Sequence, residues 1–174
     1  MRIKIAIIAV LLVLLPVGMA LAQAAPPTMY DTLVAAGNFK TYLSAVDKAN
    51  VQELKLMTGP FTLFAPTDEA FAKLPKDFMD GVMADAARVR DLVFYHITPG
   101  KYMAKDLPGL KQCKTLCPTD RGDLLVLTKV GDKYMVGTAS IIKADVPASN
   151  GIIHVIDAVL LPKWAPKSLL KPTS

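Results

Sequence analysis

Apolar positions in the first half of the chain recur with the period of an α-helix. Four of them are spaced i, i+3, i+4 and i+7, which places their side chains on one helical face. They are Phe39, Tyr42, Leu43 and Val46. The pattern predicts a helix that begins at about Asn38, after a shorter helix that Asp31 caps and Gly37 ends. Further short helices are predicted over residues 51–57, 67–71 and 84–94.

The second half of the chain consists of β-branched or aliphatic runs separated by turn residues. Together with an earlier run between two prolines, the predicted strands cover residues 61–65, 123–129, 133–137, 141–143 and 152–161. Gly131-Asp132 predicts a two-residue hairpin turn, because glycine tolerates the positive φ that such a turn needs. Helices first and antiparallel strands later indicate an α+β domain and not an alternating α/β domain.

The N-terminus, residues 1–22, has the three parts of a secretory signal peptide. A purely apolar run follows Arg2 and Lys4, and Ala20-Leu21-Ala22 supplies the small residues of a cleavage site. An uncleaved membrane anchor is the alternative, since the uncharged stretch is just long enough to span a bilayer. The Ala-x-Ala ending favours cleavage after Ala22, and we therefore expect a periplasmic or secreted protein.

One domain accounts for the rest of the chain. Residues 23–29 are expected to form a flexible lead-in, residues 30–162 the domain, and residues 163–174 an irregular peripheral tail. The net charge of +5 falls to +3 without the two basic residues of the signal peptide, and no run of Lys or Arg follows. A nucleic-acid partner is therefore not indicated. We expect a monomer.

Three sequence blocks resemble the signature blocks of fasciclin-like domains. Residues 59–75 (GPFTLFAPTDEAFAKLP) resemble the first block, and residues 95–101 (YHITPGK) the central Tyr-His segment. Residues 144–157 (ADVPASNGIIHVID) resemble the last block, which residues 159–162 (VLLP) close. The blocks occur in the family's order and at about its spacing. With the preceding helices they cover essentially the whole mature chain.

This resemblance implies a wedge-shaped β-sandwich flanked by several short helices. It also implies an extracytoplasmic location and a role in adhesion or protein contact. The family's Tyr-His segment has been linked to receptor binding, so Tyr95 and His96 are the binding residues that the resemblance implies. The sequence departs from the family at Gly137-Thr138, which replaces an Asn-Gly turn, and at residues 113–122, which contain a cysteine pair that most members lack.

The other motif residues are expected to be structural. From its position after an apolar helix, His96 is expected to be buried, donating one hydrogen bond and accepting another. Thr67 or Asp68 is its expected partner. His154 lies in an apolar strand and is expected to be a satisfied strand histidine. The full set of expected structural residues is Thr67, Asp68, Asn150, Gly151 and His154.

Cys113 and Cys117 are the only cysteines of the chain. An even count in an exported protein predicts a disulfide, which across so small a loop would fix a local turn. A zinc site is not expected, because His96 and His154 lack the close spacing of paired ligands. No other metal or cofactor is predicted either. A thiol oxidoreductase stays an alternative, although Cys-x3-Cys differs from the reactive Cys-x-x-Cys motif.

No catalytic motif is present in the sequence. There is no Gly-x-Ser-x-Gly nucleophile elbow, no phosphate loop and no dinucleotide-binding glycine pattern. We therefore expect a non-catalytic binding module that contacts an unidentified protein of a cell surface, a matrix or a host. The main alternative is an apolar small-molecule or lipid carrier, which would need a crevice lined by leucines and methionines such as Met79 and Met83.

Overall fold

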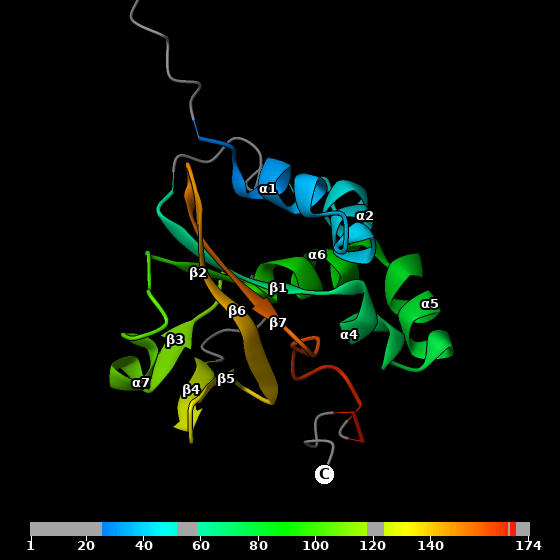
Figure 1. Cartoon of the computed structure of the whole chain (residues 1–174). Helices are drawn as coiled ribbons and strands as arrows, with labels where there is room; N and C mark the ends of the chain where they lie inside the picture. Colours follow the sequence, from blue (N-terminus) through cyan, green and yellow to red (C-terminus); the bar gives the residue numbers. More distant parts are fainter. Residues whose placement is uncertain (1–25, 52–58, 118–123, 167, 170–174) are drawn as a thin grey trace, which may run out of the picture.

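Helices gather on one side of a curled sheet in the computed structural model (Figure 1). The model describes residues 26–51, 59–117, 124–166 and 168–169. The helices are α1 (Met29–Ala36), α2 (Lys40–Lys48), α4 (Asp68–Ala72), α5 (Lys76–Ala84), α6 (Ala86–Tyr95) and α7 (Leu107–Leu110). The strands are β1 (Phe61–Pro66), β2 (Ile97–Pro99), β3 (Gln112–Lys114), β4 (Leu124–Val130), β5 (Lys133–Val136), β6 (Ala139–Ala148) and β7 (Gly151–Ile156). The predicted α+β class is confirmed.

The centre of the sheet is a parallel pair of strands that are far apart in sequence. The seven strands follow the order β2-β1-β7-β6-β5-β4-β3, and only β1 and β7 run parallel. Their register runs from Phe61 opposite Gly151 to Pro66 opposite Ile156. Every residue of β7 is buried, as is typical of strands covered on both faces. The first and last signature blocks therefore lie side by side (Figure 1).

The sheet curls until its two edges nearly meet. Its longest strand, β6, has register shifts around Lys143 that bend it against β7. At the edges, the Leu116 amide donates to the Ile97 carbonyl oxygen at 2.8 Å. The Thr98 Oγ1 lies 3.6 Å from the Cys113 Sγ. The two halves of the wedge are thus parts of one nearly closed sheet.

Several helix boundaries differ from the predictions because capping groups come from other positions. Thr28, not Asp31, caps α1. Asp31 is at position N3, where its side chain accepts from the Thr28 amide and completes a capping box. The helix predicted over residues 84–94 begins after Asp85, whose carboxylate accepts from the Ala87 and Arg88 amides. Met79 and Met83 are four residues apart, so they share a face if the stretch is helical. Both lie in α5, so the condition is met. The helix predicted over residues 51–57 lies, apart from residue 51, outside the described residues.

Two hairpins set the order of the late strands. Gly131-Asp132 forms the predicted two-residue turn, with Val130 opposite Lys133 and a φ of 59° at Gly131. The turn between β6 and β7 consists of Ser149 and Asn150, because Ala148 pairs with Gly151. Asn150 therefore occupies the left-handed position of that turn, with a φ of 50°.

The packed unit extends beyond Pro162. Ala165 is 3% exposed, and the Trp164 ring lies 6.3 Å from the Phe78 ring of α5. The start of the predicted peripheral tail is thus part of the fold. Within the described ranges, no helix has the length and apolar character needed to cross a bilayer. The predicted signal peptide, residues 1–22, lies outside them.

Candidate functional site

His96 is fully buried at the end of α6, with both ring nitrogens engaged. Its Nδ1 donates to the Leu92 carbonyl oxygen at 2.7 Å, and its Nε2 accepts from the Leu160 amide at 3.0 Å. The amide cannot accept, so these contacts assign the proton to Nδ1. The predicted one donor and one acceptor are present, but the partners are backbone groups and not Thr67 or Asp68. Burial lowers the pKa of His96 to about 4, against the raising effect of the Leu92 bond, so the ring is neutral.

His154 fastens the bend of β6 to the loop before α7. Its Nδ1 accepts from the Asp145 amide at 3.2 Å, and its Nε2 donates to the Tyr102 carbonyl oxygen at 2.8 Å. The Asp145 carboxylate in turn accepts from the Ala104 amide at 2.8 Å. Asp145 has a φ of 58°, which this ring of hydrogen bonds holds in place. Burial lowers the pKa of His154, although the Tyr102 bond and the Asp145 charge raise it.

Thr67 and Asp68 cap two different helices. The Thr67 hydroxyl accepts from the Ala70 amide and begins α4, as predicted. The Asp68 carboxylate reaches α2, where it accepts from the Lys40 and Thr41 amides at 3.2 and 2.7 Å. Burial raises the pKa of Asp68, but the hydrogen bonds from Thr41 and Lys40 outweigh it and lower the pKa overall.

Asn150 and Gly151 join three segments at the other end of the central strands. The Asn150 Oδ1 accepts from the Met29 amide at 2.9 Å, and its backbone oxygen accepts from the Phe61 amide at 3.1 Å. A Cβ on Gly151 would lie 1.9 Å from the Phe61 carbonyl oxygen. Only glycine therefore fits between β1 and α1 at this position.

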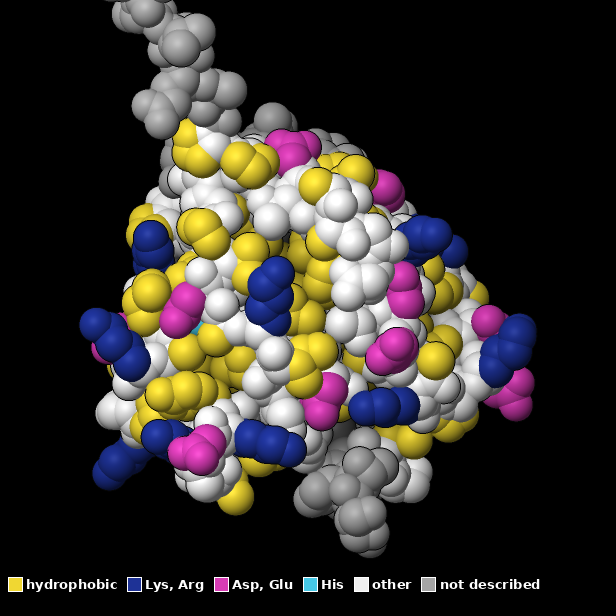
Figure 2. Space-filling model, in the orientation of Figure 1, with side chains coloured by type: hydrophobic (Ala, Val, Ile, Leu, Met, Phe, Trp, Pro, Cys, Tyr) yellow, Lys and Arg dark blue, Asp and Glu magenta, His cyan; other side chains and the backbone are white. Residues whose placement is uncertain are grey.

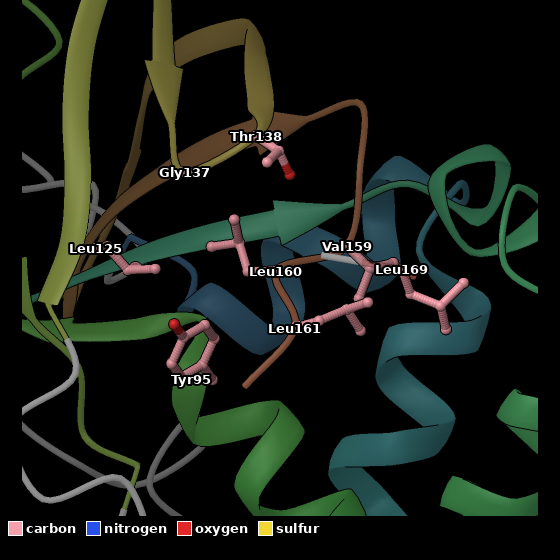
Figure 3. Close-up of a pocket in the computed structure, with 8 residues that line it drawn as sticks. All are labelled: Tyr95, Leu125, Gly137, Thr138, Val159, Leu160, Leu161 and Leu169. Atoms are coloured by element: carbon pink, nitrogen blue, oxygen red, sulfur yellow. The ribbon is translucent and has the colours of Figure 1, made fainter. Parts of the chain in front are cut away.

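Tyr95 lines a small cavity beside His96 (Figure 3). Its ring points toward the segment that contains Val159, Leu160 and Leu161. The cavity volume is about 150 Å³, below the range of small-molecule sites, and Tyr95 is 8% exposed. Because His96 binds the Leu160 amide, it holds one wall of this cavity. The structure therefore buries both Tyr95 and His96 and exposes neither as a contact surface.

The predicted disulfide is not formed. Cys113 and Cys117 are both buried thiols. The Cys113 side chain points to Thr98 of the opposite sheet edge, where the hydroxyl lies 3.6 Å from its sulfur, so it helps to close the sheet. Burial raises the pKa of the Cys113 thiol more than the Thr98 contact lowers it. Such a thiol lacks the thiolate character of a redox cysteine, which also disfavours the oxidoreductase alternative.

The motif residues therefore have structural partners instead of a shared catalytic geometry. His96, His154, Asp68 and Asn150 bind backbone groups of four different segments. Among the described residues, no group of three or more His, Cys, Asp or Glu side chains is placed to hold a metal ion. Met79 and Met83 line a shallow cavity of about 430 Å³ together with Asp68 and Phe71, and they pack against the core.

The most apolar exposed strand is β4, which the sequence predicted as a strand without assigning it a role. Leu124, Val126 and Val130 are 46%, 46% and 62% exposed, while Leu125 and Leu127 are buried on the inner face. The signal was present in the sequence, because aliphatic residues occupy both faces where polar alternation is usual for a solvated strand. We call Leu124, Val126 and Val130 the β4 row.

Comparison with known proteins shows one consistent similarity. Residues 37–162 match the model of the fasciclin domain. Protein sll1483 of Synechocystis is 38% identical over 133 residues, which cover 74% of this chain and 71% of that protein. Human periostin is 29% identical over 143 residues, which cover 82% of this chain and 17% of periostin.

A solved structure has the same fold. It is a FAS1 domain pair from the insect cell adhesion molecule fasciclin I, with a TM-score of 0.65 and 19% identity. The match covers 79% of this chain and 52% of the insect chain.

Proposed function

Because the chain belongs to the fasciclin domain family, we propose that it is an exported, non-catalytic module that binds a protein of a cell surface, a matrix or a host. The insect protein of the same fold is named a cell adhesion molecule, which supports a binding role. The absence of a catalytic arrangement among the described motif residues supports the same function, because their polar groups already have backbone partners.

The observation that carries the proposal is the β4 row. Monomeric proteins expose single apolar residues often, but three exposed aliphatic side chains on one strand face, with only the Thr128 side chain between Val126 and Val130, form an apolar surface patch. Lys114 lies opposite Leu124, and Lys133 lies opposite Val130, so each end of the row has a lysine on the same face. The partner that fits this surface is a protein patch with an apolar centre and an acidic rim.

Tyr95 and His96 have a supporting role in this proposal. Both are buried, so a direct contact with a partner would require them to become exposed. His96 binds the Leu160 amide, and Tyr95 and Leu160 line the same cavity as Leu125 of β4. Their contribution to the proposed binding is therefore structural, on the inner side of β4.

The test is saturable binding of the labelled protein to washed cells of the source organism, with unlabelled protein as competitor. Val126→Glu should weaken binding at least tenfold, because it places a charge in the centre of the row. Val34→Glu is the matched control, since Val34 is 53% exposed on α1, away from the row. Lys133→Glu should weaken binding severalfold if the partner's rim is acidic. Equal binding of the Val126→Glu and Val34→Glu variants would overturn the proposal.

The domain organisation is part of the same proposal. Cleavage after Ala22 would release residues 23–174 to the periplasm or the medium, as a monomer. Intact-mass measurement of the protein from the exported fraction checks the cleavage site, and light scattering of the same sample checks the monomer. A full-length mass in the membrane fraction would instead support the anchor.

A further inference from the structure

A groove separates α1 from strands β6 and β7. Its cavity volume is about 400 Å³, within the range of small-molecule sites. The floor is formed by four buried apolar side chains. They are Leu33, Phe39, Ile153 and Val155. Figure 2 shows hydrophobic side chains gathered on this face below α1 and over β6 and β7, with a basic side chain standing among them.

The groove follows from the local structure of its walls. Along β7, Ile153 and Val155 face the groove, whereas His154 between them faces the loop that it binds. On the β6 side, the register shift between Lys143 and Val146 bends the strand away from its regular pairing. On the helix side, the wall contains Ala36, whose side chain is small, and α1 ends directly after it.

Among the described residues that line the groove, Lys143 alone is charged. Lys143 pairs with Val155, so its side chain lies on the groove face of the sheet, and it is exposed. No carboxylate is among the described lining residues, which otherwise contribute only Thr32 and Asn38 as polar groups. None of the ion pairs found between described residues involves Lys143. An apolar trough with one ammonium group at its rim is complementary to an apolar molecule with one anionic head.

We propose that this groove binds a long-chain carboxylate, with the hydrocarbon tail on the floor and the carboxylate at the Lys143 Nζ. The site is separate from the β4 row and does not depend on the protein contact proposed above. It also differs from a crevice lined by methionines, because no methionine is among the lining residues that the structure describes. The structure thus assigns an amphipathic-ligand site to a groove whose sheet wall includes Val146, Ile153 and Val155 of the last signature block.

Calorimetric titration with octanoate, decanoate and dodecanoate, each below its micelle concentration, tests the site. Each added methylene that is buried should tighten binding about fourfold, since it contributes about 0.8 kcal/mol. The gain should stop once the tail is longer than the groove. The absence of saturable decanoate binding at millimolar concentration would overturn the proposal.

Variants of the groove wall separate this site from unspecific binding. Ala36→Phe should fill the trough and weaken decanoate binding at least tenfold. Val34→Phe is the matched control, because Val34 is an exposed residue of the same helix that does not line the groove. Val146→Phe narrows the groove from the opposite wall and should have the same effect, in case the helix variant changes the fold. Equal affinity of the Ala36→Phe and Val34→Phe proteins would contradict the assignment.

The role of the lysine has its own readout. Lys143→Gln should weaken decanoate binding about three- to fivefold, which corresponds to the free energy that an exposed ion pair usually contributes. The same substitution should leave the binding of 1-decanol unchanged, because the alcohol carries no charge. Lys105→Gln, an exposed lysine of the loop before α7 that is not among the described residues lining the groove, is the control and should change neither. A Lys143→Gln protein that binds decanoate as tightly as the wild type would show that the groove does not select an anionic head.

Discussion

At the scale of single residues, the buried histidines connect segments of the chain through their ring nitrogens. Each ring uses one nitrogen as donor and the other as acceptor. Three of the four partner atoms belong to residues 9, 52 and 64 positions away from the histidine in sequence, whereas Leu92 is only 4 positions from His96. A protonated ring would carry two N–H donors and would lose its acceptor. The neutral form is therefore part of the fold, which makes stability depend on pH.

The pH dependence has a definite sign. The unfolded chain protonates His96 near its ordinary pKa of 6.5, whereas burial lowers the pKa in the folded chain to about 4. Its stabilising contribution is therefore complete above pH 6.5, decreases as the pH falls below 6.5 and is lost by about pH 4. The loss in unfolding free energy should be on the order of 3 kcal/mol.

Urea unfolding at a series of pH values between about 7 and 4 measures this dependence, because the series spans the pKa of His96 in both the unfolded and the folded chain. The His96→Asn variant should be less stable at neutral pH but should lose less stability on acidification. Part of the decrease in unfolding free energy with falling pH should persist in that variant, because burial also lowers the pKa of His154. Identical slopes for the two proteins would show that His96 does not control the acid sensitivity.

Gly151 is the residue whose replacement should damage the sheet most directly. In Gly151→Ala the new Cβ would meet the Phe61 carbonyl oxygen and the Met29 Cε, at 1.9 and 2.5 Å, so β1 and β7 would have to separate. The expected loss of unfolding free energy is at least about 2 kcal/mol. Gly81→Ala in α5 is the control, because its Cβ meets nothing within 4 Å, and it should gain about 0.5–1 kcal/mol. Denaturant unfolding of both variants gives the comparison.

At the scale of elements, the helices are tied together by caps that cross between them. Asp68 begins α4 and at the same time binds the first amides of α2, while the Asp68 amide donates to the Asn38 carbonyl oxygen. The negative charge lies at the N-terminal ends of both helices, where the helix dipoles stabilise it. The first signature block therefore fixes the angle between two helices as well as forming a strand.

Removal of this shared cap should lower the unfolding free energy by more than the removal of a carboxylate that serves a single helix. Asp68→Ala should lower the unfolding free energy by about 1–2 kcal/mol, because the amides of Lys40 and Thr41 lose their acceptor. Glu69→Ala removes the neighbouring exposed carboxylate of the same helical turn and should cost only a few tenths of a kcal/mol. A similar cost for both variants, measured by thermal unfolding, would argue against a bridging role for Asp68.

At the scale of the whole molecule, burial is greatest in the central parallel strands and declines toward the sheet edges. β1 and β7 are covered on both faces, whereas β3 and β4 expose alternate residues. In the described part of the chain, the edges approach each other through the contacts of Ile97 with Leu116 and of Thr98 with Cys113. The fold is thus a rigid centre with a more accessible half that carries the β4 row.

Hydrogen exchange should follow this gradient. The amides of β1 and β7 should exchange only on global unfolding, because opening them requires the core to be exposed. The amides of β3 and α7 should exchange through local opening, at lower free energy. Exchange measured by mass spectrometry on peptic fragments checks the order, and faster exchange in β7 than in β3 would contradict it.

The local elements were predictable because their signals are contiguous in sequence. The strand between two prolines, the Thr67 cap of α4 and the Gly131-Asp132 hairpin depend on neighbouring residues only, and the structure has each of them. The family blocks added the fold class. Boundaries failed where a capping group came from a different position, as with Thr28 at α1 and Asp85 at α6.

The sequence by itself determined the α+β class, the main strands and the burial of the two histidines, because hydrophobic period and turn chemistry act over a few residues. Only the tertiary structure decided the parallel pairing of β1 with β7, the partners of His96 and the use of Asp68 by α2. It also decided that Cys113 faces Thr98 across the closing sheet instead of Cys117. These contacts join residues whose distance along the chain carries no local signal, so they depend on how the sheet curls. The groove under α1 has the same origin, since its walls belong to elements that meet only in the folded molecule.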